Sequence, residues 1–208
     1  MLTLLSVCCC PGFMVGWSLL PTPLYIAARR PLAALDRFAV SCADAEIAPH
    51  PGSLASPPEI PRGWRVNRHE VVVGEGREAY RRARAALQRL DFMRLPWLDV
   101  TVRGDVLAIC SRQFGCAWLL NANRLLERSS GRREATLRWA TSRRHVLVGE
   151  ERIAVRWDAR TDAVTFSVLS FSRPRHVISA VSYPLVLLQQ RRFARDAGRV
   201  MVRAGAAG

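Results

Sequence analysis

The chain has 208 residues, 50% of them hydrophobic, and 31 basic against 17 acidic side chains give a formal net charge of +14. This composition suits one packed domain with a short extension, and it excludes wholesale disorder, collagen, a coiled coil and a multi-span membrane protein. The basic residues are all arginines, in scattered pairs such as Arg81–Arg82 and Arg143–Arg144 rather than in one long run. We therefore expect solvated positive faces and no specific nucleic-acid partner, although such a charge also suits an anionic membrane surface.

Residues 1–47 are expected to form an N-terminal extension that is apolar at first and mixed afterwards. No charged side chain precedes Arg29, but three prolines interrupt the apolar run, which argues against a membrane span. The lack of basic residues at the start argues against a signal peptide. Three consecutive cysteines, Cys8 to Cys10, could accept palmitate near a membrane. The extension is therefore open to interpretation as a targeting segment, a membrane anchor or an artefact of the start site.

Residues 48–63 contain five prolines and two glycines, a composition that predicts a linker. A single compact domain is expected over residues 64–203, followed by a short tail at 204–208. The six cysteines of the chain form no Cys-x-x-Cys pair, and no histidine pair has metal-ligand spacing. We therefore expect no metal, no cofactor and a reducing, cytoplasmic location, with membrane association as the alternative.

Within this domain, Val66–Val73 is expected to be a strand, and apolar residues at helical spacing follow from Glu78 to Leu90. The clearest hairpin joins the alternating patterns of Ile153–Trp157 and Val164–Val168 through a turn at Asp158–Asp162. Weaker alternation predicts further strands within the ranges 100–110, 113–127, 135–141 and 146–148.

A long helical pattern then runs from about Arg175 to Val202, and Pro184 inside it should kink or split the helix. The order is therefore strand, helix, several antiparallel strands and a long C-terminal helix. This order predicts an α+β fold in which a curved antiparallel sheet grips the C-terminal helix, with one further helix near the domain start. The layout is that of a helix-grip, START-like protein.

The segment from Gly74 to Ala79 matches the loose G-x-G-x-x-A dinucleotide pattern. That pattern binds a pyrophosphate only within a parallel βαβ unit, whereas the alternating strands downstream predict an antiparallel sheet. Glu75 and Glu78 would also place negative charge where the phosphates should lie. We therefore expect no dinucleotide cofactor.

His145 lies close in sequence to Glu150 and Glu151, but without the H-E-x-x-H spacing that places two ligands on one helical face. We expect these residues on the surface rather than in a metal site. No G-x-S-x-G elbow is present either. No catalytic residue is nominated, so an enzyme is the third choice among the functions considered.

Aromatic residues are the best candidates for a binding site in such a fold. An aromatic wall for an apolar ligand is predicted on the strands and the terminal helix, formed by Trp139, Trp157, Phe166 and Tyr183. Packing in a filled core is the alternative for the same side chains.

Four short motifs of the domain are distinctive: Phe171-Ser-Arg-Pro174, Tyr183-Pro184, Gln190-Arg-Arg-Phe193 and Gly149-Glu150-Glu151. With these motifs, the chain resembles the domain-of-unknown-function family nineteen-ninety of bacteria and plants over roughly residues 60–203. The family is similar in layout to the START and pollen-allergen-like helix-grip superfamily, which mostly encloses hydrophobic ligands. The resemblance implies that fold, but it brings no catalytic residue with it.

Two functions are therefore predicted, in order of preference. The first is a non-catalytic binding domain for a hydrophobic or lipid-like small molecule, held between the sheet and the terminal helix. The second is a membrane-associated protein that acts through its uncharged N-terminus and its arginine-rich surface. The oligomeric state is left open.

Overall fold

The computed structural model describes residues 14–16, 25–27, 32–55, 58–113, 117–175 and 177–206. Cys8 to Cys10, on which the palmitate interpretation depends, lie outside these residues. The described strands are β1 (Met14–Gly16), β2 (Tyr25–Ala27), β3 (Arg65–Glu75), β4 (Leu98–Arg103), β5 (Val106–Gln113), β6 (Ala117–Ser130), β7 (Glu134–Thr141), β8 (Leu147–Trp157) and β9 (Ala163–Pro174). The described helices are α1 (Leu32–Ser41), α2 (Gly76–Gln88), the short 3₁₀ helix η1 (Asp91–Met93), α3 (Val177–Val181) and α4 (Tyr183–Ala206).

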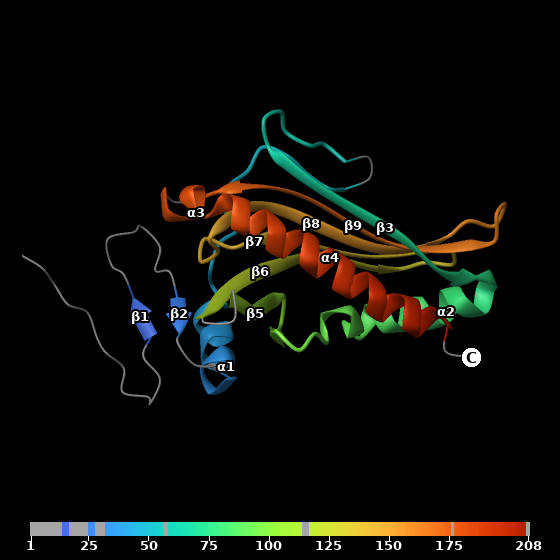
Figure 1. Ribbon diagram of the computed structural model, residues 1–208, viewed down its shortest axis with the longest axis horizontal. Helices are drawn as coiled ribbons and strands as arrows, with labels where there is room; N and C mark the ends of the chain where they lie inside the picture. The colour runs from blue at the N-terminus through green and yellow to red at the C-terminus, as the bar shows by residue number, and fades with distance from the viewer. Residues whose placement is uncertain are drawn as a thin grey trace, which may run out of the picture.

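The described strands form one antiparallel sheet in the order β1-β2-β6-β7-β8-β9-β3, and β5 joins β6 to β4. The predicted hairpin is confirmed, because β8 and β9 pair from Leu147↔Pro174 to Trp157↔Val164. Figure 1 shows α4 running across one face of the sheet, with α2 beside its C-terminal end. The chain therefore has the predicted α+β fold, an antiparallel sheet that grips a long C-terminal helix.

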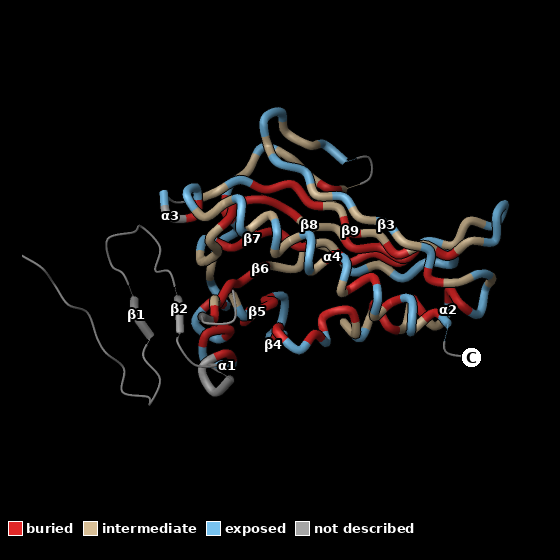
Figure 2. The backbone as a smooth tube through the Cα atoms, viewed as in Figure 1, coloured by how far each residue is buried: buried red, intermediate tan, exposed pale blue. Residues whose placement is uncertain are grey.

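The main core lies between the sheet and the layer formed by α2, η1 and α4, and we call this side of the sheet the inner face. Figure 2 shows that the central strands are largely buried. Phe92 of η1 lies at the centre, where its ring contacts those of Trp139, Phe166 and Phe193 at centroid distances of 6.3, 6.0 and 6.4 Å. The interior is thus filled at this point by an aromatic residue from a connecting segment.

The terminal helix is split as predicted, into α3 and α4, with Ser182 between them. Pro184 is the second residue of α4, where its missing N–H removes no helical hydrogen bond. The backbone N–H groups of Leu185 and Val186 both donate to the Ser182 carbonyl oxygen, which closes the first turn. The proline therefore starts the second helix instead of bending a continuous one.

The part of α4 from Ala194 onward, which we call its C-terminal half, packs most closely on the sheet. Its buried residues are small or flexible and all lie in this half: Ala194, Ala197, Gly198, Met201 and Gly205. A Cβ atom on Gly205 would lie 2.0 Å from the carbonyl oxygen of Val73, so only glycine permits this approach of helix to strand. The N-terminal half of α4 has no buried residue in the described structure and leaves Leu188 55% exposed.

The opposite face of the sheet, here the outer face, is also covered. Helix α1 packs on β5 and β6 through Leu35, Phe38 and Ala39, which form a second apolar cluster with Cys42, directly after the helix, and with side chains of those strands. Our sequence-based expectations place no element in this part of the extension. Part of the proline-rich segment 47–61 lies against the sheet as well: Ile47 forms a β-bridge with Ser142, and Ala48 and Leu54 are fully buried.

Candidate functional site

The candidate site is built around two consecutive glutamates of β8, Glu150 and Glu151, which lie on opposite faces of the sheet. Glu150 is opposite Ala140 and Phe171, whereas Glu151 is opposite Trp139 and Ser170. Because successive side chains of a strand point to opposite faces, Glu151 shares the inner face with Trp139, and Glu150 lies on the outer face.

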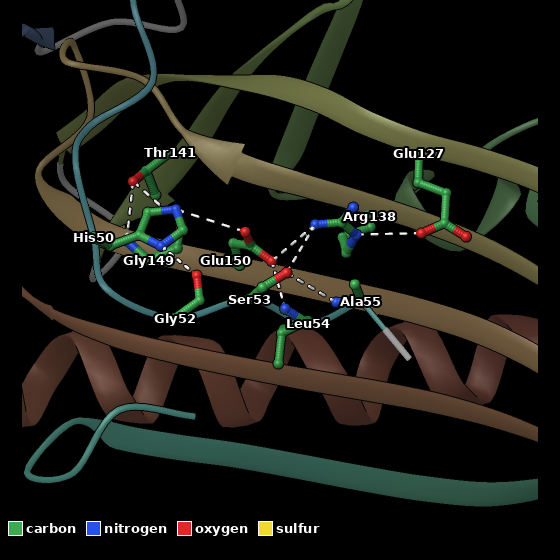
Figure 3. Close-up of polar contacts among 10 residues, drawn as sticks. All are labelled: His50, Gly52, Ser53, Leu54, Ala55, Glu127, Arg138, Thr141, Gly149 and Glu150. Atoms are coloured by element: carbon green, nitrogen blue, oxygen red, sulfur yellow. Dashed lines mark hydrogen bonds and ion pairs between the residues drawn. The ribbon is translucent and has the colours of Figure 1, made fainter. Parts of the chain in front are cut away.

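Glu150 is the centre of a buried ion-pair cluster on the outer face (Figure 3). Its side chain lies 3.3 Å from Nη1 of Arg138 and 3.7 Å from Nε2 of His50, and it accepts a 2.7 Å hydrogen bond from the Leu54 backbone N–H. Arg138 also contacts Glu127 at 3.2 Å. Glu150 is only 5% exposed, so our expectation of a surface residue is wrong. The cluster is buried because the proline-rich segment crosses the sheet at this point.

Gly149 lets the strands pass close together beside these glutamates. Its φ is +154°, and a Cβ atom there would lie 2.0 Å from the carbonyl oxygen of Phe171. The Thr141 hydroxyl accepts a hydrogen bond from the Gly149 N–H at 3.0 Å and donates one to the Gly149 carbonyl at 3.3 Å. Only glycine fits at this position without a clash with the β9 backbone. The close approach of β8 to β9 at Gly149 sets the register of the two glutamates that follow it.

On the inner face, Glu151 belongs to a cross-strand set that runs over three strands. Glu151 of β8, Ser170 of β9 and Asn67 of β3 are successive partners in the strand registers. We call these three residues the polar row. Trp139 extends it on the β7 side and donates an indole hydrogen bond of 3.0 Å to the Glu151 carboxylate. A polar row of this kind is unusual on a face that elsewhere forms the core.

The surroundings of Glu151 change the pKa of its carboxyl group. Desolvation by burial raises its pKa from the ordinary 4.5 to about 7, while the hydrogen bond from Trp139 acts in the opposite direction. Near neutral pH the group therefore populates both its neutral and its ionised form. The neutral form can donate a hydrogen bond, and the ionised form can accept one.

Asn67, at the other end of the polar row, has an unmet hydrogen-bonding requirement. Its Nδ2 atom is buried and has no hydrogen-bond partner among the described residues. Ser170, between Asn67 and Glu151, is 5% exposed. A buried amide N–H group without an acceptor costs roughly 1–3 kcal/mol.

The start of α4 lies over the end of the sheet that contains the polar row. The Tyr183 hydroxyl donates to the Ser172 carbonyl at 2.9 Å, and Gln190 Nε2 lies 3.3 Å from Ser172 Oγ. Burial raises the pKa of Tyr183, so its phenol stays a hydrogen-bond donor at neutral pH. Ile109, Leu125 and Phe193 are only partly buried where they pack against the main core. Of these, Leu125 is the cross-strand partner of Trp139, so partly exposed apolar surface lies at that end of the polar row.

The four predicted wall residues lie in different places. Trp139 and Phe166 both contact Phe92 in the core. Trp157 stacks on Tyr80 of α2 with a centroid distance of 6.3 Å. Tyr183 lies near Ser172, at the other end of the β8–β9 pair from Trp157. Trp139 and Tyr183 are therefore close to the polar row, and Phe166 and Trp157 are not.

Glu151 and Asn67 are candidate binding residues that our sequence reading did not nominate. The Gly149-Glu150-Glu151 motif was the available signal for Glu151, whereas Asn67 carries no signal in the sequence. Within the described ranges, no group of three or more histidine, cysteine, aspartate or glutamate side chains could hold a metal ion. The Gly74–Ala79 segment comprises the end of β3 and the start of α2, and β3 pairs with the antiparallel strand β9, so the segment does not belong to a parallel βαβ unit.

The fold and the polar row define an α+β protein of helix-grip layout with a polar site beneath its terminal helix. Residues 50–200 match the model of the family described as domain of unknown function (DUF1990), and the chain belongs to this family. The resemblance seen in its sequence motifs is thereby confirmed.

Relatives of the chain have been described as UPF0548 proteins. One from Arabidopsis thaliana is 28% identical over 152 residues, covering 68% of this chain and 73% of the relative. One from Deinococcus radiodurans is 32% identical over 155 residues, covering 67% and 78%.

Solved structures with a similar course of the chain are distant in sequence. An aromatase/cyclase of Streptomyces sp. R1128 has a TM-score of 0.44 and 13% identity, covering 70% of this chain and 98% of its own. Norcoclaurine synthase of Thalictrum flavum has a TM-score of 0.43 and 11% identity, with coverage of 70% and 98%. Among the described helices of the present chain, none has the length and apolar character needed to cross a membrane.

Proposed function

We propose that this protein binds a small, largely apolar molecule between the inner face of the sheet and the N-terminal half of α4. The polar row would hold a hydroxyl or carbonyl group of that molecule, and the neighbouring apolar side chains would contact its body. Sites for small molecules commonly combine a mostly apolar lining with a few placed polar groups.

The observation that carries this proposal is the buried amide of Asn67 without an acceptor, on the same row as Glu151. A hydroxyl or carbonyl oxygen of a ligand can accept a hydrogen bond from Asn67. Glu151 lies two strands away, so it would bond a second oxygen of the ligand: the neutral carboxyl can donate to it, and the ionised carboxylate can accept from it if it is a hydroxyl. The polar row thus supports an uncharged oxygen-bearing group rather than an anion.

Differences in packing along α4 support the same location. The C-terminal half of the helix is held against β3 by small residues, whereas Leu185 and Leu188 in the N-terminal half are 43% and 55% exposed. Trp139 and Tyr183 are the two predicted wall residues that we retain for this site. Phe166 contacts Phe92 and Trp157 contacts Tyr80, so we do not include these two residues in the proposed site. Their role as wall residues stays an untested prediction.

The alternative function, attachment to a membrane through the N-terminus and the arginine-rich surface, remains a prediction. Most of residues 1–31 lie outside the described part of the chain, including the three consecutive cysteines. The cytoplasmic location likewise remains a prediction.

Native mass spectrometry of the full chain, purified without added ligand, tests the proposal. We expect a retained small molecule that is released on denaturation, and we expect Glu151→Gln to retain less of it. Glu70→Gln is the matched control, because Glu70 is an exposed residue of β3 beside the same helix-grip core. A Nile red titration provides a second measurement of apolar binding. An apo mass together with no saturable Nile red binding would contradict the proposal.

A further inference from the structure

A concave site lies between α4 and the segment that joins η1 to β4, and none of its lining residues belongs to the polar row. It has a volume of about 430 Å³ and is lined by five arginines: Arg94, Arg112, Arg192, Arg199 and Arg203. We call it the arginine groove. Its size is within the range of roughly 300–1,000 Å³ that is usual for small-molecule sites.

One wall of the arginine groove is a single face of α4. Arg192, Asp196, Arg199 and Arg203 follow one another at intervals of four, three and four residues. This spacing places them in one stripe along the helix, so their side chains share a surface. Arg191 and Arg195 belong to the same helix but do not line the groove, and both are exposed.

The other wall comes from the segment between η1 and β4, together with β5. Trp97 in this segment is 8% exposed, and its indole N–H donates to Asp196 Oδ2 at 3.1 Å. The Trp97 carbonyl accepts a 2.9 Å hydrogen bond from the Arg112 backbone N–H, which ties the segment to β5. The two walls are thus joined by direct contacts, and the groove is a built feature of the fold.

Asp196 and Trp97 orient two of the guanidinium groups. Arg199 lies 3.1 Å and Arg192 3.6 Å from the Asp196 carboxylate. Arg192 also stacks over the Trp97 ring at 4.6 Å from its centroid. An arginine held between a carboxylate and an aromatic face loses less conformational entropy when it binds a further anion.

Charge in the groove is strongly unbalanced. Asp196 is the single acidic residue that lines it, against five arginines, within the described part of the chain. Asp91, just outside, pairs with Arg94 at 3.1 Å. Even with both carboxylates counted, positive charge remains in excess inside a concave surface, where the field is stronger than on a flat face.

We propose that the arginine groove binds a small molecule through a phosphate or pyrophosphate group. The planar guanidinium presents parallel N–H donors that match two oxygens of a phosphate, and several arginines in one groove can share its charge. The phosphate group can come from a free organic phosphate or from the headgroup of an anionic phospholipid. This site is separate from the polar row and does not depend on its proposed ligand.

Isothermal titration of the full chain with inorganic pyrophosphate tests this proposal. We expect Arg192→Gln/Arg199→Gln to weaken binding about tenfold or more, since a hydrogen bond to a charged group contributes roughly 1.5–3 kcal/mol. The matched control, Arg191→Gln/Arg195→Gln, removes the same charge from the adjacent exposed side of α4, and we expect nearly unchanged affinity. Far-ultraviolet circular dichroism of both variants verifies that they fold.

A second arm identifies the source of the phosphate group. Sedimentation is measured with phosphatidylcholine vesicles that contain phosphatidic acid, with and without competing pyrophosphate. Sedimentation that depends on Arg192 and Arg199 supports a lipid headgroup. Pyrophosphate binding that depends on these arginines, without sedimentation, supports a free organic phosphate.

Two results would overturn the proposal. One is an equal loss of affinity in the groove variant and in the control variant, because net charge alone would then explain binding. The other is a folded wild-type chain that binds neither pyrophosphate nor the vesicles. Glu151→Gln should leave pyrophosphate binding unchanged, which separates this proposal from the one for the polar row.

Discussion

Glu150 and Glu151 are adjacent in β8, yet their carboxyls lie on opposite faces of the sheet and in different surroundings. Glu150 is buried against Arg138 and accepts a hydrogen bond from Leu54, so its charge is matched. Glu151 faces the inner side and has the indole N–H of Trp139 as a hydrogen-bond donor. One glutamate therefore anchors a covering segment, and the other belongs to the polar row on the inner face.

The first prediction concerns the pH dependence of stability. The pKa of Glu151 is raised to about 7 from 4.5, so the folded state binds its proton more tightly than the unfolded chain does. The contribution of Glu151 to stability should therefore fall as the pH rises from about 4.5 to about 7, by at most about 3 kcal/mol, and then level off. Burial lowers the pKa of His145 from 6.5 to about 3, which raises stability with pH over part of the same range, so the difference between the wild-type chain and Glu151→Gln isolates the Glu151 contribution. Urea unfolding at several pH values measures this. Glu151→Gln should lose this decline and Glu70→Gln should keep it; an unchanged profile in Glu151→Gln would refute the assignment.

The second prediction concerns the anchor of the proline-rich segment. Glu150→Ala removes the acceptor of the Leu54 N–H and one partner of Arg138, and should cost about 3 kcal/mol of unfolding free energy. Hydrogen exchange of the Leu54 amide should become faster as well. Glu59→Ala, in the same segment but exposed, is the control and should change stability by less than about 0.5 kcal/mol. Equal effects of the two variants would contradict the anchoring role.

The third prediction compares two glycines of α4. A Cβ atom on Gly205 would lie 2.0 Å from a backbone oxygen of Val73, whereas on Gly198 it would lie 3.0 Å from the side chain of His69. A side chain can move aside, but a strand backbone cannot. Gly205→Ala should therefore destabilise the protein by roughly 1–3 kcal/mol or more. Gly198→Ala should cost clearly less. Thermal unfolding measures both, and the reverse order would show that α4 does not approach β3 so closely.

The fourth prediction concerns the aromatic centre of the core. Phe92→Ala removes a ring that contacts Trp139, Phe166 and Phe193, and should cost roughly 3–5 kcal/mol. Phe92→Leu fills most of the volume and should cost much less. Chemical denaturation of both variants gives the difference. A cost below about 1 kcal/mol for the alanine variant would mean that Phe92 does not fill the interior.

Local sequence patterns determined most of the fold of this protein. The alternation in Ile153–Trp157 and Val164–Val168 predicted the β8–β9 hairpin, because a half-buried strand repeats every two residues. Pro184 likewise marked the break between α3 and α4, since proline is tolerated in the first turn of a helix but not in its interior. The family motifs agreed with these patterns and with the match over residues 50–200.

The tertiary structure alone decided which polar residues come together. The sequence does not reveal that Asn67 and Glu151, which are 84 positions apart, share one row, because that depends on the registers of β3 and β8 with β9. Nor does it separate the arginines of the groove from those beside them, since only the packing of α4 against the Trp97 segment distinguishes the two sets. Periodicity reports whether a face is buried, while the partners on that face are set by contacts between distant segments.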